Sequence, residues 1–388
     1  MRWLVVVAVA LVLAGCGSTP EAPQPADELR DTTPEVSVSR SWQRHVSYGQ
    51  ATAGDALPPV LVDGRILVAD HRGWIRAHAP DDGRREWRMR VEEGVVSGGP
   101  GIHGDLVVVG TRSGRVIAME APDGEQRWQA RVSSEVLAVP SVGDNRVVVR
   151  SADGRVYGFD ADTGAQRWVH DTSVPSLTLR GTGDPVRGGG RVLVGFDNGV
   201  LKALDVTTGE AAWEVTLSDP RGSADLDRMR DVDATPVVRD GVVYAVAYRG
   251  VLAAVDLRSG ETAWDRELSS HAGLAVDDER VYVAGERGRI WAVDRRTGAA
   301  IWRQNDTEGL EASPPAVHGD FVVFGDDRGR LTVLSRKDGR ILGRVAVRDD
   351  TPISEAPVSD GEAVYVLTDD GHLTRYRLRA LDSGSDAE

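Results

Sequence analysis

The residue types that most often catalyse reactions or bind metals are scattered along this chain. Its eight His residues are dispersed, and His103 and His318 occupy the same position of a repeated pattern, which argues against a shared metal site. No Gly-x-Ser-x-Gly, Walker-type or His-Glu-x-x-His motif occurs. Cys16 is the only cysteine, so the rest of the chain has no thiol for catalysis and no internal disulfide. The sequence predicts a protein without catalytic residues, cofactor or metal.

Acidic residues are the chemical group with a regular spacing. Each follows an apolar residue and precedes two variable residues, a Thr or Ser, a Gly and, four residues beyond the Gly, a Trp. The clearest copies run from Asp160 to Trp168, Asp205 to Trp213, Asp256 to Trp264 and Asp294 to Trp302. One hypothesis is a catalytic pair among these carboxylates. The alternative, which we favour, is that each carboxylate accepts hydrogen bonds from turn amides ahead of its Gly.

The acidic motif belongs to a longer repeat of about forty residues. Each unit contains two further turns, as at Asp240-Gly241 and Arg249-Gly250, and both series of turns count eight. Val-rich segments that alternate in polarity, such as 242–246, separate the turns. Four short strands per unit are typical of a propeller blade. The sequence therefore predicts an all-β fold, an eight-bladed β-propeller of four-stranded antiparallel blades.

The two ends of the repeat region complement each other. The last unit, residues 354 to 378, holds three strands without the final Gly turn and Trp, whereas Ser41-Trp42-Gln43 is a lone fourth strand. We expect the N-terminal strand to pair into the last blade and close the ring, because closure removes exposed strand edges. The repeated Trp should pack between neighbouring blades. Gly343 stands where a Trp is expected, so its junction should be the loosest.

The N-terminus carries an export signal. Its apolar run from Leu4 to Leu13 is too short to span a bilayer. The motif Leu13-Ala14-Gly15-Cys16 resembles a bacterial lipobox, in preference to a chance Cys behind a secretory signal. This resemblance implies cleavage before Cys16 and acylation of Cys16. With Gly17 in place of Asp, it implies a lipid anchor at the periplasmic face of the outer membrane.

Four parts are expected along the chain. They are a lipoprotein signal peptide (1–15), a lipidated flexible tether (16–40), the propeller (41–379) and a disordered acidic tail (380–388). The formal net charge of −14 argues against a nucleic-acid partner, because phosphate binding relies on clustered Lys and Arg.

The repeat as a whole resembles the pyrroloquinoline-quinone repeat of quinoprotein alcohol and glucose dehydrogenases, whose propellers also have eight blades. That resemblance implies, as an alternative, a dehydrogenase with the quinone beside a Ca²⁺ ion near the ring axis. In many of those enzymes the cofactor lies against a vicinal disulfide, whereas this chain has a single Cys and lacks their long insertions. A dehydrogenase is therefore the second hypothesis. The third is a lipoprotein that binds peptidoglycan or another envelope protein.

Two loops of consecutive blades are longer than most others. Trp168 precedes Pro185 by 17 residues and Trp213 precedes Pro236 by 23, whereas the step is 12 to 14 residues at four other junctions. Strand alternation brings both loops to the same face of the ring. Apolar residues at a spacing of two in the first loop either enter the blade or contact a partner, and the residues alone leave both interpretations open.

At these loops the chain resembles the BamB family, the outer-membrane propeller lipoproteins of the β-barrel assembly machinery. The segments Pro-Ser-Leu-Thr-Leu-Arg-Gly (175–181) and Asp-Val-Asp-Ala-Thr-Pro-Val-Val (231–238) carry the resemblance, with the lipobox and the eight units. It implies a non-enzymatic scaffold that assists the insertion of β-barrel proteins and binds a polypeptide-transport-associated (POTRA) domain of the barrel subunit BamA. It also implies unfolded outer-membrane proteins as clients.

The resemblance further implies which residues contact BamA. Carried over at matching positions, they are Leu177, Leu179, Arg180, Asp231 and Asp233. Two apolar anchors, a guanidinium and two carboxylates suit a small interface whose register is set by charge.

Overall fold

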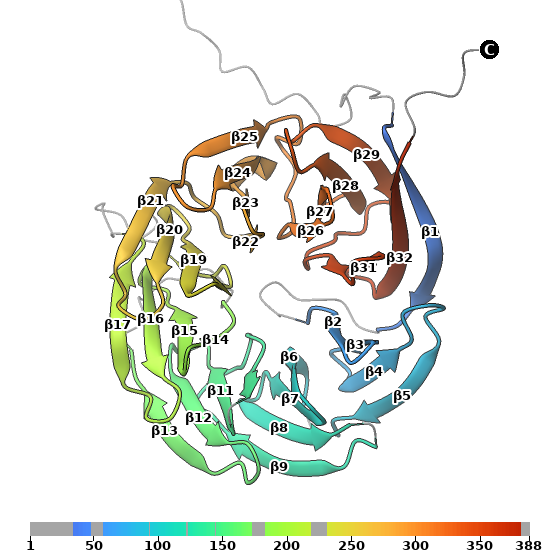
Figure 1. Ribbon diagram of the computed structural model, residues 1–388. Coiled ribbons are helices and arrows are strands. Elements are labelled where there is room, and N and C mark those ends of the chain that lie inside the picture. Colours follow the sequence, from blue (N-terminus) through green and yellow to red (C-terminus); the bar gives the residue numbers. More distant parts are fainter. Residues whose placement is uncertain are drawn as a thin grey trace, which may run out of the picture.

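The chain folds into a ring of small antiparallel sheets, each of which we call a blade (Figure 1). The computed structural model describes residues 34–47, 57–92, 94–121, 123–143, 145–172, 183–218 and 231–381. Within these residues it contains eight four-stranded sheets, which confirms the predicted eight-bladed propeller. Across the same ranges, no helix is long and apolar enough to cross a membrane.

The first four blades follow each other in chain order. Blade 1 contains β2 (Val60–Val62), β3 (Arg65–Ala69), β4 (Trp74–His78) and β5 (Arg85–Arg90). Blade 2 contains β6 (Val96–His103), β7 (Leu106–Thr111), β8 (Arg115–Glu120) and β9 (Gln126–Arg131). Blade 3 contains β10 (Ser141–Gly143), β11 (Arg146–Arg150), β12 (Val156–Asp160) and β13 (Gln166–His170). Blade 4 contains β14 (Val186–Gly188), β15 (Arg191–Gly195), β16 (Val200–Asp205) and β17 (Ala211–Thr216).

The remaining blades complete the circle. Blade 5 contains β18 (Val237–Arg239), β19 (Val242–Val246), β20 (Val251–Asp256) and β21 (Thr262–Glu267). Blade 6 contains β22 (Gly273–Val276), β23 (Arg280–Ala284), the 3-10 turn η3 (Glu286–Gly288), β24 (Ile290–Asp294) and β25 (Ala300–Gln304). Blade 7 contains β26 (Ala316–His318), β27 (Phe321–Gly325), β28 (Arg330–Ser335) and β29 (Ile341–Ala346). Blade 8 contains β30 (Val358–Ser359), β31 (Val364–Leu367), β32 (His372–Ala380) and the N-terminal β1 (Val36–His45).

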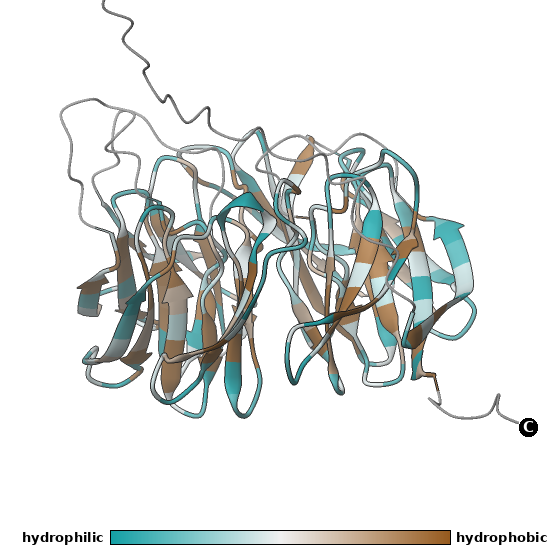
Figure 2. Cartoon of the chain, turned by 90° about the horizontal axis from the view of Figure 1, so that it is seen from above, coloured by the Kyte–Doolittle hydropathy of each residue, from teal (hydrophilic) through white to brown (hydrophobic). Residues whose placement is uncertain are grey.

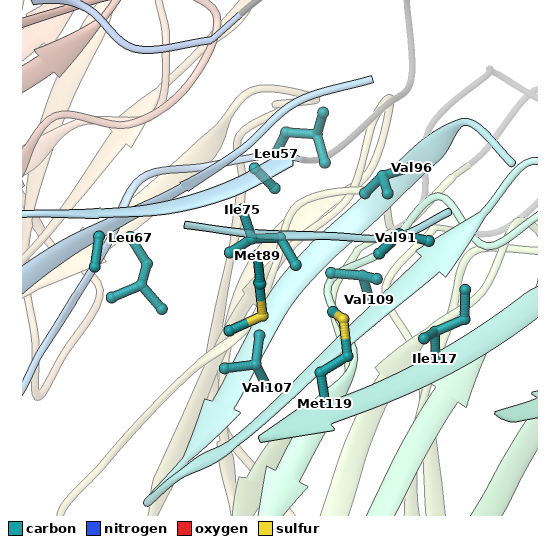
Figure 3. Packing of buried hydrophobic residues seen from close by; sticks show 12 residues of the cluster. Leu57, Leu67, Ile75, Met89, Val91, Val96, Val107, Val109, Ile117 and Met119 are labelled. Atoms are coloured by element: carbon teal, nitrogen blue, oxygen red, sulfur yellow. The ribbon is translucent and has the colours of Figure 1, made fainter. Parts of the chain in front are cut away.

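The core lies between the blades. The middle strands are Val-rich and buried on both faces, as in β7, where all six residues are buried. Figure 3 shows the junction of blades 1 and 2, where Ile75 and Met89 of blade 1 belong to one cluster with Val107 and Met119 of blade 2. Each buried side chain of this kind stabilises the fold by about 1.5–3 kcal/mol. Figure 2 shows the apolar strands in the interior and the polar residues at the turns.

Blade 8 closes the ring as predicted, with its outer strand taken from the N-terminus. β1 pairs antiparallel with β32, from Val36 opposite Ala380 to His45 opposite His372. The paired strand begins at Val36, before the expected propeller boundary at residue 41. No edge of β32 is left exposed, so the closure protects the blade against edge-to-edge association.

The repeated Trp side chains join consecutive blades. Nε1 of Trp168 in blade 3 donates a hydrogen bond to the carbonyl of Val206 in blade 4 at 3.1 Å. A Cβ atom on Gly209, in the same turn, would lie 2.5 Å from Cε3 of that indole, so only Gly allows this approach. The same bond to a turn carbonyl of the next blade is made by Trp42, Trp128, Trp213, Trp264 and Trp302. The prediction that Trp packs between blades is confirmed.

The repeated Asp side chains organise the turns that receive these indoles. Oδ1 of Asp205 accepts hydrogen bonds from the backbone N–H groups of Thr207 and Thr208 at 2.8 and 2.9 Å. Those bonds hold the pKa of Asp205 below its ordinary value. Asp160, Asp256 and Asp294 accept the equivalent pair of turn amides. Their structural interpretation is confirmed.

The expectation that Gly343 marks the loosest junction is wrong. Blade 8 takes its outer strand from the N-terminus, so no Gly turn follows β32 to receive an indole. Instead β1 packs directly on β29: the N–H of Glu35 donates to the carbonyl of Leu342 at 2.9 Å. A Cβ atom on Gly343 would lie 3.2 Å from the carbonyl oxygen of Val36. Gly343 permits a close contact that a Trp would obstruct.

The irregular junction lies between blades 1 and 2. There the Gly turn of blade 2 faces Met89, because a Cβ atom on Gly124 would lie 2.4 Å from Cβ of Met89. Trp87 is only partly buried, and within the described ranges its indole N–H donates to no carbonyl of the next blade. Met adapts to irregular gaps more readily than Trp. At this junction a contact between Met89 and the Gly124 turn therefore replaces the contact between a Trp and a Gly turn.

Candidate functional site

The residues predicted to contact a partner fall in two groups. Leu177, Leu179 and Arg180, like Cys16, lie outside the described residues. Asp231 is described, and Asp233 follows it in the segment that leads into β18. The structure therefore describes the predicted surface through the residues that flank two long loops. We call residues 173–182 the first long loop and residues 219–230 the second long loop.

The two long loops return to the ring side by side. Asp184 follows the first long loop and Thr235 follows the second. The N–H of Asp184 donates to Oγ1 of Thr235 at 3.1 Å, and Oγ1 of Thr235 donates to Oδ2 of Asp184 at 3.1 Å. A Cβ atom on Gly183 would lie within 3.4 Å of the carbonyls of residues 232 to 234. These contacts join the ends of both loops on one face, which we call the loop face.

Asp231 is held by its backbone at the start of this segment. Its carbonyl accepts the N–H of Tyr248 in blade 5 at 2.9 Å, and the next N–H, of Val232, donates to the carbonyl of Phe196 in blade 4 at 3.3 Å. None of the surface of Asp231 is exposed. A direct contact between its carboxylate and a partner would thus require the segment to move. In this structure Asp231 anchors the end of the second long loop between two blades.

Asp233 lies two residues further along the same segment, and its side chain has different surroundings from that of Asp231. The residue is partly exposed, but its Oδ1 atom is buried and forms no hydrogen bond with the described residues. Burial, with the nearby charge of Asp231, raises the pKa of Asp233 well above its ordinary value. Of the two predicted carboxylates, Asp233 is the one that keeps exposed surface.

Comparison with known proteins identifies the family. The family model described as outer membrane protein assembly factor BamB matches residues 71–304 and 286–384. A relative of that name from Alkalilimnicola ehrlichii is 43% identical over 377 residues, which cover 97% of each chain. The relative of that name from Escherichia coli is 35% identical and covers 87% of this chain and 88% of its own. The chain belongs to the BamB family.

A crystal structure of another BamB-family protein agrees with this assignment. The structure of BamB from Moraxella catarrhalis has a TM-score of 0.79 at 28% identity and covers 88% of this chain and 100% of that chain. The quinohemoprotein alcohol dehydrogenase from Comamonas testosteroni has a TM-score of 0.66 at 17% identity, which shows a shared fold alone. The BamB family consists of non-enzymatic assembly factors, so the dehydrogenase hypothesis is not retained.

Two partly buried carboxyl groups of this BamB-family ring were missed by sequence reasoning. Asp184 accepts the N–H of Val139 at 2.7 Å, and Glu355 accepts the N–H of Leu57 at 3.1 Å. Burial raises the pKa of Asp184 to about 6 and that of Glu355 to about 8. A sequence signal for Glu355 exists, because the residue two before the blade's Pro is small in five other blades and is Leu57 in blade 1. The small residues are Gly98, Ala138, Gly183, Ala234 and Ser313.

Replacement of Glu355 by Gln is expected to stabilise the ring at alkaline pH. The Glu355 carboxyl has a pKa of about 8 in the fold and an ordinary value of 4.5 when unfolded. Between these values the folded chain binds the extra proton, so stability falls as pH rises and the loss is complete above the folded pKa. Gln cannot ionise. We expect Glu355→Gln to raise the melting temperature by about 2–4 °C near pH 9 and to leave it unchanged near pH 5.

Thermal unfolding of both proteins at the two pH values measures this effect. The control is Glu362→Gln, which changes an exposed Glu of the same blade. A gain of equal size at both pH values would contradict the assignment, since a pH-independent gain cannot come from ionisation.

Proposed function

We propose that this chain is the lipid-anchored scaffold subunit of the outer-membrane β-barrel assembly complex and binds a POTRA domain of BamA through its two long loops. It assists the folding and insertion of β-barrel proteins without covalent chemistry. The observation that carries the proposal is the joining of the two loop ends on one face by Asp184 and Thr235, in a chain of the BamB family.

The contact set combines apolar and charged residues. Leu177, Leu179 and Arg180 of the first long loop form the proposed direct contacts, with apolar anchors at the centre and charge setting the register. Asp233, which is partly exposed, completes the set. Asp231 belongs to the same set, and its burial supports a role in holding the second long loop in place.

The described N-terminal strand begins at the other face of the ring. Val36, at the start of β1, pairs with Ala380 at the far end of β32 from the Gly371 turn. That turn is equivalent to those at Gly199 and Gly250, beside which the loop face is built. A lipid on Cys16 would thus reach the ring from the face opposite the loops. Eighteen residues, 16–33, span at most about 60 Å, enough to pass around the ring.

Co-purification with BamA from membranes tests the proposal. We expect Leu177→Ser, and separately the pair Asp231→Ala and Asp233→Ala, to reduce the recovered BamA by at least about tenfold, because the loss of central anchors commonly costs more than 1.4 kcal/mol. Ile301→Ser is the matched control, since Ile301 is an apolar side chain on the outer strand of blade 6 with 42% of its surface exposed.

Two results would count against the proposed interface. Full recovery of BamA with the Leu177→Ser chain would refute the loop face as its binding site. Recovery of peptidoglycan or another envelope protein in place of BamA from wild-type membranes would support the third hypothesis instead. Thermal unfolding of each variant shows whether the ring remains folded.

A further inference from the structure

We propose that Arg150 is a positioning residue for the partner-binding face, because its buried positive charge compensates the carboxylates on which the ends of both long loops rest. This inference rests on the proposed function. It concerns a residue that no partner can touch, so it differs in kind from the contact set.

Arg150 is buried at the loop-face end of β11. Only 1% of its surface is exposed. Its Nη2 atom donates to Oδ1 of Asp197 in blade 4, and its guanidinium lies 5.6 Å from the ring centroid of Phe196. Among the described residues, its Nε and Nη1 atoms have no hydrogen-bond partner. The side chain therefore spans the junction of blades 3 and 4 and holds its charge inside the protein.

The repeat shows that this Arg is exceptional. At the same strand position the other seven blades have small or apolar residues. These residues are Ala69, Gly110, Gly195, Val246, Ala284, Gly325 and Leu367. In blade 4, a Cβ atom on Gly195 would lie 2.6 Å from Cγ1 of Val232, a residue of the segment that follows the second long loop. A small residue here normally makes room for an apolar side chain of the returning loop.

The loop that follows the blade of Arg150 carries a small residue where the loops of four other blades carry an apolar one. The residue four positions before the blade's Pro is apolar after four other loops (Val96, Val136, Val232 and Ile353) and acidic before Pro59 and Pro315 (Asp55 and Glu311). After the first long loop it is Gly181. A large residue in the strand is thus paired in the sequence with a small one in the loop. Arg150 replaces an apolar loop contact by a charged one at the blade that precedes the first long loop.

The charges around Arg150 are carboxylates of the two loop ends. Burial raises the pKa of Asp184, and the charge of Arg150 acts in the opposite direction. For Asp233, burial and Asp231 raise the pKa, and Arg150 again opposes them. Asp197 is 5% exposed and is paired with Arg150 directly. The charge of Arg150 therefore acts on acidic groups that follow both long loops.

Removal of this charge is expected to displace the ends of the long loops while the ring stays folded. A buried carboxylate that loses its cation either takes up a proton or moves toward water. The carboxylate of Asp184 holds Thr235, and Asp197 adjoins Phe196, whose carbonyl accepts the N–H of Val232, so movement of either carboxylate shifts the end of one long loop relative to the other. A binding surface made of two loops depends on that relative position.

The test uses the full-length chain in membranes and the recovery of BamA. Arg150→Met is expected to reduce recovery at least tenfold, whereas Arg150→Lys, which retains the positive charge, should stay within threefold of wild type. The matched control is Arg146→Met. Arg146 begins the same strand at the opposite face, where it lies 3.8 Å from Asp160, and its loss should leave recovery unchanged. Rescue by Lys separates charge compensation from packing.

Each outcome decides between the claims. Wild-type recovery with Arg150→Met overturns the positioning role, and equal loss with Met and Lys overturns charge compensation. Leu177→Ser, measured in parallel, reports on the proposed function itself: if it binds BamA normally, the loop face is not the interface. Where Arg150→Met does not accumulate as a folded protein, Arg150→Gln carries the same expectation, since it keeps a donor for Asp197 and removes the charge.

Discussion

A chain that begins at residue 46, and so lacks β1, is expected to lose its cooperative fold. β1 supplies the outer strand of blade 8, and its pairing with β32 spans that strand from His372 to Ala380. Its buried side chains include Val36 at 3% and Trp42 at 7% exposure. The loss of two such side chains costs about 5 kcal/mol or more, which approaches the whole stability of a typical domain of about 5–15 kcal/mol. The edge of β32 would also be open to association.

The matched control for this truncation is a chain that begins at residue 34. It lacks residues 1–33 but retains β1. We expect it to be monomeric in size-exclusion chromatography and to unfold in a single sharp thermal transition. The chain that begins at residue 46 should elute as aggregate and show no such transition. A monomeric, cooperatively folded product from the shorter chain would show that ring closure contributes little to stability.

Trp168→Ala is expected to be the most damaging single substitution in the regular part of the ring. It removes a side chain that is 7% exposed, the hydrogen bond to Val206, and the surface on which Gly209 rests. Large aromatic-to-Ala changes in cores cost about 3–5 kcal/mol. The indole reaches across a blade junction, so the effect should appear as a lower midpoint of urea unfolding for the whole ring.

Trp87→Ala provides the comparison at the irregular junction. Trp87 occupies the same position of blade 1, but the next Gly turn packs on Met89 instead. We expect its loss to cost about half as much as that of Trp168, because the hydrogen bond and the stacked turn are missing. Equal destabilisation by the two substitutions would show that the contact between the indole and the turn adds nothing to the free energy of unfolding.

The regular part of the fold was predictable because each blade repeats the same local chemistry. Asp205 and Gly209 specify a turn, and Trp213 follows at a fixed distance, so the order of strands could be inferred from residue types alone. Closure by β1 was predictable for the same reason, since Trp42 is the Trp that occurs in the fourth strand of a repeat. Gly343 was misjudged because its neighbour is not another repeat. Its environment depends on a strand from the opposite end of the chain, which a local pattern does not contain.

The candidate site was predictable in outline only. Loop lengths indicated which blades carry extra residues, but not that Asp231 is buried by the backbone contacts of two blades. The acidic group at Asp184 and the Arg at position 150 look ordinary in a chain with so many charges. Their importance arises from burial, a property of packing between consecutive blades. A comparison of equivalent positions along the repeat would have found Arg150, because the other blades have no charge there.

The pairing of β1 with β32 also sets the order in which the protein can mature. The first strand to emerge during synthesis has to wait for the last, more than three hundred residues later, before its hydrogen bonds can form. Contacts between such distant positions form late, because the intervening chain must be ordered first. The incomplete chain therefore remains open while it is being synthesised, and the torus closes only once its final strand is available.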